Sequence, residues 1–260
     1  MNSKLFYFFY KRSLYVLPYG QMSLWGIVMP QTYNLSLYII LILVVNLTTG
    51  KVCRKIKGVY RIGPHNTEIL SIIFGCLLGD AYAEKRALGV GTTISFFQEE
   101  THLSYIHFLH SILSQAGYCN NKTPIIKQRL GVKGKVRKIA RFHTWTYTSF
   151  NWIHEMWYIN GRKCVPYNIG EYLTPLALAV WIMDDGAKVG KGLKFSSNSF
   201  TYEECLRLVN ALDNNFNLKA SVQSAGAENQ YIIYIWKQSL NDLSNIVNPF
   251  IIPEMKYKII

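Results

Sequence analysis

Acidic residues are scarce in this chain and are missing altogether from two long stretches. The 260 residues include 28 Lys and Arg but only 15 Asp and Glu, which gives a formal net charge of +13. No acid precedes Glu68, and none lies between Glu100 and Glu155. An ordinary solvated face mixes charges of both signs, so this imbalance favours a polyanionic partner over a merely solvated surface. That partner is either nucleic acid or an anionic membrane.

Cysteine pairs and long apolar runs are also lacking. The five cysteines are spread singly, without a CxxC pair, and no HExxH sequence occurs, which argues against a zinc site. Scattered cysteines fit buried thiols in a reducing compartment. The longest uninterrupted apolar run, from Leu37 to Val45, falls short of the ~20 residues that a standard membrane span requires.

Residues 1–63, called the leader below, differ from the rest of the chain. They are rich in Tyr, Leu and Ile, carry basic residues at both ends, and finish at a Gly63-Pro64 pair that is typical of a boundary. The stretch VLPYGQMSLWG, from Val16 to Gly26, resembles a segment of cytochrome b near its quinol-oxidising site. That resemblance implies an intron reading frame that continues from an upstream exon. A membrane-surface or targeting segment is the alternative, and the sequence does not tell whether the leader is cleaved. We predict that the leader lies outside the fold.

A pattern of helices and strands occurs twice after the leader. The first copy is predicted as a helix from Asn66 or Thr67, a polar turn region, the strand TTISFFQ, a helix over 103–116, strands over 124–130 and RFHTWTYT (141–148), and a helix over 152–158. The second is predicted as a helix ending at Asp185, LKFSSNSF, a helix opened by a capping box at Thr201–Glu204, the strands KASVQSA and QYIIYIW, and a helix over 240–247. Asp80 and Asp185 are about 105 residues apart, so we expect a duplicated domain. Its halves are 64–165 and 166–260.

Two of these helices are predicted to end on acids. IIFGCLLGDA runs into Asp80, and LALAVWIMDDG runs into Asp184 and Asp185. Acids are disfavoured there because the C-terminal end of a helix is already partly negative. Gly75 and Gly79 lie four residues apart on the first helix, which favours close packing of the two helices and brings Asp80 and Asp185 together.

Paired acids near a basic surface indicate metal-dependent phosphate chemistry. Two neighbouring carboxylates repel each other unless cations neutralise them. Magnesium is a fitting cation, because it needs few carboxylates and completes its shell with water and phosphate oxygens. The alternative is that the glycines serve core packing alone, which leaves the two acids without a purpose.

Both acids fall in segments that resemble a known motif. IFGCLLGDA (73–81) and LAVWIMDDG (178–186) are similar to the nine-residue motif of two-motif LAGLIDADG homing endonucleases, in the branch of the mitochondrial omega-intron enzyme. The flanking signatures agree: F-x-Q-x-x-x-H-x-x-Y at Phe96, Gln98, His102 and Tyr105, KCVP at 163–166, YLTP at 172–175, SFT at 199–201 and IPEMKYK at 252–258. The resemblance covers roughly residues 64–260. The middle motif positions depart from the ideal at Leu78-Gly79 and Met183-Asp184, but the last acids are retained.

The resemblance implies an α+β fold of two pseudo-symmetric αββαββα units, with saddle-shaped antiparallel sheets around a central two-helix interface. It also implies a monomer that cuts both strands of duplex DNA by Mg²⁺-dependent phosphodiester hydrolysis and so promotes intron mobility. The implied metal-binding residues are Asp80, Asp185, Gly79 and Asp184, and the implied catalytic residues are Asp80, Asp185, Lys163 and Lys258. For the lysines, an ordinary surface position beside a stiff proline is the alternative. Gln98 is a weaker candidate for the same role near the cleavage site.

Nucleic-acid contacts are expected from the basic strands. The candidates are Gln98, Lys127, Arg129, Lys133, Lys135, Arg137, Lys138, Arg141 and His143. RFHTWTYT places Arg141, His143, Trp145 and Tyr147 on one side, and the sequence does not say which side faces the groove. The expected partner is the intronless cytochrome b gene in the mitochondrion. The alternative function is an RNA maturase that assists splicing of its own group I intron, since phosphate contacts serve DNA and RNA alike.

Overall fold

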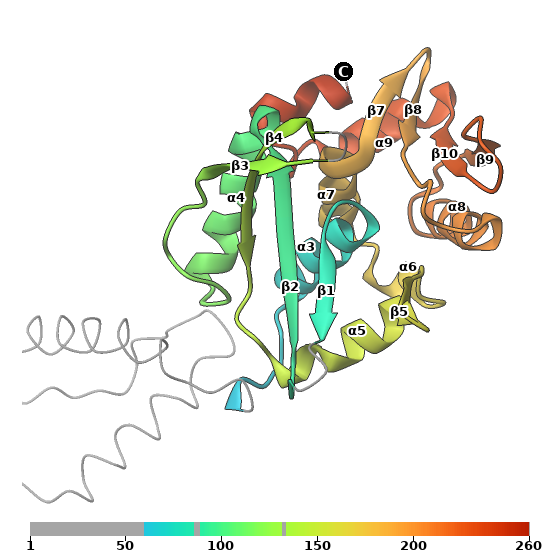
Figure 1. Cartoon of the computed structure of the whole chain (residues 1–260). Helices are drawn as coiled ribbons and strands as arrows, with labels where there is room; N and C mark the ends of the chain where they lie inside the picture. Colours follow the sequence, from blue (N-terminus) through green and yellow to red (C-terminus); the bar gives the residue numbers. More distant parts are fainter. Residues whose placement is uncertain (1–59, 86–88, 132–133, 260) are drawn as a thin grey trace, which may run out of the picture. The chain divides into compact units, whose positions relative to one another are not determined.

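The structure is a computed structural model that describes residues 60–85, 89–131 and 134–259 (Figure 1). Residues 1–59 of the leader and Lys133 therefore lie outside the described residues. Helix and strand labels below follow Figure 1. Among the described residues, no helix combines the length and the apolar character needed to cross a membrane.

Two helices, α3 (Thr67–Leu78) and α7 (Pro175–Asp185), pack side by side at the centre (Figure 1). Nearly every residue of both is buried, which explains why both are apolar all round. The Asn66 side chain accepts a hydrogen bond from Ile69 N at 3.1 Å, so the predicted cap of α3 is confirmed. Thr174 caps α7 in the same way, ahead of a proline at the first helical position.

Small residues let the two helices approach closely, as predicted. A Cβ added at Gly75 would lie 2.5 Å from the Ala177 carbonyl oxygen and 2.8 Å from Val180 Cβ. At the other end of the interface, the Thr174 hydroxyl donates to Ser71 Oγ at 2.8 Å. The close contact fixes the relative position of the two C-terminal ends, where the acids lie.

Two antiparallel four-stranded sheets flank this helix pair, and both have the same strand order. The first sheet is β1 (Tyr82–Lys85), β2 (Thr92–Glu99), β4 (Val136–His143) and β3 (Ile126–Leu130), in that order. The second sheet is β7 (Gly186–Val189), β8 (Gly192–Phe195), β10 (Tyr231–Ile235) and β9 (Ala220–Ser224). The α+β fold with antiparallel sheets around a two-helix interface is thus confirmed. The boundaries of the leader and of the two halves stay predictions.

The remaining elements cover the sheets and connect them. In the described ranges they are α4 (Leu103–Gln115), α5 (Asn151–Trp157), α6 (Ile169–Tyr172), α8 (Tyr202–Phe216) and α9 (Leu240–Val247), a short hairpin of β5 (Tyr158–Ile159) and β6 (Arg162–Lys163), and the 3₁₀ turns η3 (Glu100–His102), η5 (Thr148–Phe150), η6 (Lys237–Ser239) and η7 (Pro253–Lys258). The predicted capping box at the start of α8 is confirmed, with Thr201 and Glu204 bonding each other's backbone N–H groups.

Two predicted strands need correction. RFHTWTYT is not a strand over its length, because β4 begins at Val136 and ends at His143. Beyond that point the chain leaves the strand, and Trp145 lies under the Arg61 guanidinium, 5.3 Å from the ring centroid. The region after Asp80, which the sequence predicts to be only a turn, contains β1. This strand is four residues long and half-exposed, so its sequence lacks a clear apolar alternation.

Candidate active site

The ends of α3 and α7 bring Asp80 and Asp185 into one electrostatic site. Asp185 is the last residue of α7, and Asp80 follows the cap of α3. Gly79 packs directly on Asp184, since a Cβ at Gly79 would lie 2.5 Å from Asp184 Cβ. Burial, together with the nearby charge of Asp80, raises the pKa of Asp185 to about 7, although Lys163 and Lys258 oppose this. The expected meeting of the two acids is therefore present in the structure.

Asp184 is the most buried of the three acids, with 8% of its surface exposed. Its Oδ1 accepts a hydrogen bond, whereas its Oδ2 is buried without a hydrogen-bond partner among the described residues. Burial first, and then the charges of Asp80 and Asp185, raise its pKa well above the usual range. An unpartnered buried oxygen is costly, so this position stores electrostatic strain beside the site.

Gln98 links the two halves of the site. Its Nε2 donates to Asp80 Oδ2 at 2.8 Å and to Asp184 Oδ1 at 2.9 Å. Its Oε1 lies 3.2 Å from His102 Nδ1, which must carry the proton because a carbonyl oxygen only accepts. His102 Nε2 then accepts from the Tyr257 hydroxyl at 3.3 Å. This chain of hydrogen bonds directs the amide nitrogen of Gln98 at the acids, and its only signal in the sequence is the four-residue spacing of Gln98 and His102.

Two lysines bind backbone oxygens beside the acids. Lys163 Nζ donates to Gly79 O at 3.1 Å and to Ala81 O at 2.7 Å. Lys258 Nζ donates to Met183 O at 2.5 Å and to Asp184 O at 2.9 Å. Each lysine thus holds the carbonyl group of the residue that precedes a motif acid.

Neither lysine is an ordinary surface residue, so the alternative considered for them is wrong. Burial lowers the pKa of Lys163 to about 8, against the attraction of the acids. Burial also lowers the pKa of Lys258, which is only 6% exposed. Both ammonium groups lie where they can balance the negative charge of the nearby acids.

The oxygen atoms present fit a divalent cation. The carboxylates of Asp80 and Asp185 are hard donors of the kind that Mg²⁺ prefers. The carbonyl oxygens of Gly79 and Asp184 each accept one hydrogen bond from a lysine, so each has one lone pair left for a cation. Burial, and then the charge of Asp80, raises the pKa of Asp185, and a cation bound beside these carboxylates would favour their ionised form. Within the ranges that the structure describes, no three His, Cys, Asp or Glu side chains are grouped to hold a metal by themselves. A bound ion would therefore also need backbone, water or phosphate oxygens.

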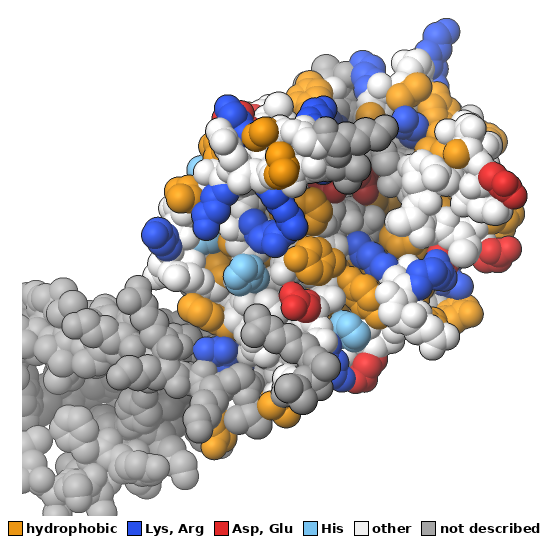
Figure 2. Space-filling view, in the orientation of Figure 1, with side chains coloured by type: hydrophobic (Ala, Val, Ile, Leu, Met, Phe, Trp, Pro, Cys, Tyr) orange, Lys and Arg blue, Asp and Glu red, His pale blue; other side chains and the backbone are white. Residues whose placement is uncertain are grey.

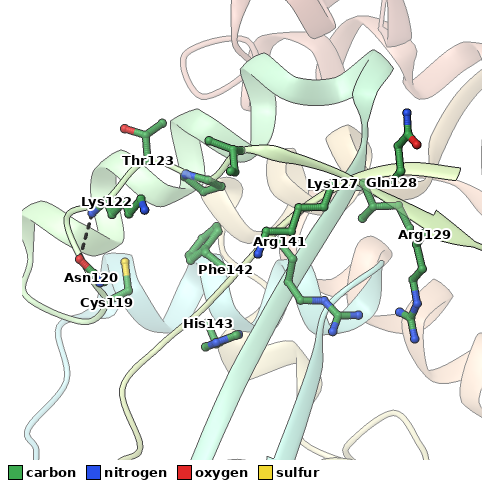
Figure 3. Close-up of a pocket in the computed structure, with 13 residues that line it drawn as sticks. Cys119, Asn120, Lys122, Thr123, Lys127, Gln128, Arg129, Arg141, Phe142 and His143 are labelled. Carbon is green, nitrogen blue, oxygen red and sulfur yellow. Dashed lines mark hydrogen bonds between the residues drawn. The ribbon is translucent and has the colours of Figure 1, made fainter.

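The basic residues of the first sheet lie mainly on its open face. On β4, Ala140 and Phe142 are buried against the helices, whereas Arg141 and His143 are exposed. This settles which side of that segment faces outward. On β3, Lys127 lies opposite Ile139 and therefore shares the open face with Arg141, as does Arg129. Figure 3 shows the side chains of Arg129, Arg141 and His143 pointing to the same side of the strands.

Ion pairs divide these basic residues into two groups. Arg137 binds Glu99 at 2.5 Å and Lys138 binds Glu100 at 3.1 Å, so both have carboxylate partners. In the described part of the chain, Lys127, Arg129 and Arg141 have none, and they line a pocket of about 610 Å³. Lys135 is exposed just before β4. Figure 2 shows Lys and Arg side chains gathered on this face over β3 and β4.

Gln98 does not belong to that face. The sequence groups it with the nucleic-acid contacts, but its side chain is only 4% exposed and points from β2 toward the helices, where the acids lie.

Comparisons with other proteins agree with this geometry. The sequence model of the LAGLIDADG DNA endonuclease family matches residues 70–243. The chain is 51% identical to the cytochrome b mRNA maturase bI2 of Saccharomyces cerevisiae, over 76% of this chain and 48% of that protein, so it spans about half the length of that relative. It is 46% identical to the bI2 maturase of Debaryomyces hansenii, over 82% of this chain and 81% of the relative.

A solved structure gives the same answer for the fold. The homing endonuclease I-WcaI bound to its DNA recognition sequence superposes with a TM-score of 0.66 at 27% identity, over 75% of this chain and 87% of that one. A family match over more than half of the chain, two relatives of high identity and this fold all coincide with the acid-bearing helix pair. The chain belongs to the LAGLIDADG DNA endonuclease family.

Proposed function

We propose that the chain is a site-specific double-strand DNA endonuclease that promotes the mobility of its intron. The observation that carries this proposal is the convergence of Asp80 and Asp185 at adjoining helix ends, with a lysine beside each whose pKa is lowered by burial. A structural role alone does not account for this arrangement, because acids and lysines buried together are costly. Strain of this kind is typical of catalytic sites.

Asp80 and Asp185 would hold Mg²⁺, together with the carbonyl oxygens of Gly79 and Asp184. When bound, the ion supplies an activated water and stabilises the leaving oxygen of the phosphodiester. Gln98 keeps the Asp80 carboxylate in place through its hydrogen bond to Oδ2. Lys163 and Lys258 add positive charge where negative charge develops in the transition state, and burial makes that charge more effective.

The open face of the first sheet would bind the DNA. Lys127, Arg129 and Arg141 have no carboxylate partner among the described residues, so their charge is available to phosphates. That I-WcaI is described bound to its DNA recognition sequence supports a duplex target. The leader's resemblance to cytochrome b and the two cytochrome b mRNA maturase relatives support the intronless cytochrome b gene, in the mitochondrion, as the target. The cutting enzyme would be a monomer with internal pseudo-two-fold symmetry.

An RNA maturase is the second candidate function. The specific observation in its favour is that both bI2 relatives are named as maturases. The partner would be the chain's own group I intron RNA. Splicing assistance needs the basic surface but not the acids, so the two functions make different demands on the same residues.

One experiment tests both. The full chain is incubated with supercoiled plasmid carrying the intronless cytochrome b exon junction and Mg²⁺, with EDTA as the control. Conversion to linear DNA is expected, and DNA that stays supercoiled at all protein concentrations would refute the endonuclease. In parallel, the same protein is added to the unspliced precursor RNA. Faster splicing by both wild type and Asp80→Asn would establish a maturase that does not require the acids.

A further inference from the structure

The hairpin that carries Lys163 is too short to hold this side chain by itself. β5 and β6 pair over two residues each, around a turn in which Asn160 and Gly161 have positive φ. An isolated two-stranded hairpin is at best marginally stable in water. The position of Lys163 therefore depends on what the neighbouring residues contact.

Arg162 ties the hairpin to helix α8. Successive residues of a strand point to opposite sides, so Lys163 reaches the end of α3 while Arg162 reaches away from it. The Arg162 guanidinium donates to both carboxylate oxygens of Glu204, at 3.0 Å and 2.8 Å. This bidentate geometry is the strongest and most directional form of such a pair. The Glu204 side chain is only 6% exposed, which protects the pair from solvent on that side.

Glu204 is itself fixed in place. Its Oε2 also accepts from Thr201 N at 2.7 Å in the capping box of α8. One turn along the helix, Arg207 donates to the Val165 carbonyl and lies 4.0 Å over the Tyr167 ring. Helix α8 thus contacts the chain on both sides of Lys163. The Glu204–Arg162 pair is called the clamp below.

We propose that Glu204 is a positioning residue for Lys163, acting through Arg162. Helix α8 packs against β9 and β10 of the second sheet, whereas Lys163 contacts the backbone around Asp80. The position of Lys163, beside Asp80, therefore depends on a helix that packs against the second sheet. This inference rests on the proposed function, in which Lys163 assists cleavage beside Asp80.

The second lysine has no equivalent clamp among the described residues. Its neighbour Tyr257 is 58% exposed and makes a single hydrogen bond to His102, at 3.3 Å. Loss of the Glu204–Arg162 pair should therefore change the position of Lys163 but not that of Lys258. Lys258 thus serves as an internal reference within the same molecule.

A matched pair of variants separates the clamp from the helix cap. Glu204→Gln keeps the capping box, since Gln also closes it, but breaks the charged pair with Arg162. Thr201→Ala removes the other half of the cap and leaves Glu204 and Arg162 unchanged. The first readout needs no DNA: the full chain is treated with an amine-reactive ester, and modification of Lys163 and Lys258 is followed by peptide mass spectrometry. The second readout is strand-resolved cleavage of the supercoiled plasmid.

We expect Glu204→Gln to raise the modification rate of Lys163 several-fold without changing that of Lys258, and Thr201→Ala to change neither. Cleavage of one strand should slow about tenfold, so that nicked circles accumulate, because small displacements of a catalytic group are costly. Arg162→Met should reproduce these effects, and the double variant should add nothing, which guards against a failure of one variant to fold.

An unchanged Lys163 rate, or equal increases at both lysines, would overturn the positioning role. Equal slowing of both strands would do so too, because it would indicate general loosening. If the wild-type protein cleaves neither strand, the proposed function fails, yet the modification rates still decide whether Glu204 positions Lys163.

Discussion

The two sheets share one strand order but expose very different surfaces. In the first, β2 and β4 are eight residues long, and β3 and β4 carry Lys127, Arg129, Arg137, Lys138 and Arg141. In the second, β9 and β10 are five residues each and contain no charged residue. Burial of an apolar interior imposes the same topology on both, whereas exposed positions are free to differ. We therefore expect the first sheet to supply most of the electrostatic affinity for a polyanion.

The two sides of the active site differ as well. Gly79 precedes the acid on the α3 side, whereas the buried Asp184 precedes it on the α7 side. The α7 side therefore has one more carboxylate, and Asp185 has a pKa raised to about 7. The two acids of one repeated pattern thus differ in the charge that surrounds them.

The largest expected effect tests whether the two acids nevertheless act as equals. Asp80→Asn and Asp185→Asn should each lower double-strand cleavage by more than about 1,000-fold, because each removes a ligand charge that the chemistry requires. DNA binding, measured by gel shift, should stay within a fewfold of wild type. If either variant cleaves at the wild-type rate with ordinary Mg²⁺, its assignment as a metal-binding acid is wrong.

The next prediction tests the contrast between the sheets. Replacing Lys127, Arg129 and Arg141 together by Gln should weaken DNA binding on the order of 10–100-fold. It should also reduce the slope of log affinity against log salt by about 0.9 for each phosphate that the protein no longer neutralises. Binding is measured by fluorescence anisotropy at several salt concentrations.

The charge-matched control removes three lysines of the second half, Lys191, Lys194 and Lys237. This control should reduce the slope of log affinity against log salt less than the triple variant of the first sheet does. Equal slopes for the two triple variants would show that the charge difference between the sheets has no bearing on binding.

Features that depend on local pattern could be predicted from the sequence. The apolar helices before Asp80 and Asp185 are recognisable because full burial requires apolar residues all round, and the cap of α8 by its Thr201–Glu204 spacing. The first half of β4 could not be predicted, since Val136, Arg137 and Lys138 are all exposed and show no alternation of apolar and polar residues.

Features that depend on tertiary contacts could not be predicted. Tyr257 and His102 are 155 residues apart, and Arg162 and Glu204 are 42 apart, so no spacing along the chain reveals either pair. The burial of Gln98 escapes prediction for a related reason. The side that a strand residue faces depends on which layer packs on the sheet, and only the fold decides that.

A third prediction uses the raised pKa of Asp185 to separate the two sides of the site. Below pH 7 this carboxyl holds a proton that a metal ion must displace, so cleavage at low Mg²⁺ should fall up to about tenfold per pH unit below 7. The midpoint should move to lower pH as Mg²⁺ is raised, because ion and proton compete. Single-turnover rates between pH 5.5 and 8.5 check this. A midpoint that is independent of Mg²⁺ would mean that another group limits the rate.

The smallest expected effect concerns stability. An acid whose pKa is raised by folding keeps its proton to a higher pH in the folded state than in the unfolded state. Folding stability therefore falls as the pH rises from about 4, the unfolded value, to about 7, and the deficit is constant above that. Asp185→Asn removes this pH-dependent loss of folding stability, because Asn carries no charge. Without metal, the variant should melt roughly 5 °C above wild type at pH 8, with a smaller gain at pH 5. Differential scanning calorimetry measures both.

The control for this prediction is Asp213→Asn, which removes an exposed acid paired with Lys219 on the surface and should not raise the melting temperature. Added Mg²⁺ should narrow the gap between wild type and Asp185→Asn, because an ion that binds the folded protein stabilises it by mass action. If Asp185→Asn melts at or below wild type at pH 8, the second acid is held without electrostatic strain. The α3 and α7 sides would then differ in sequence, but not in the energetic cost of holding the acid. A stabilised but inactive variant would instead show that the α7 side keeps a destabilising charge because catalysis requires it.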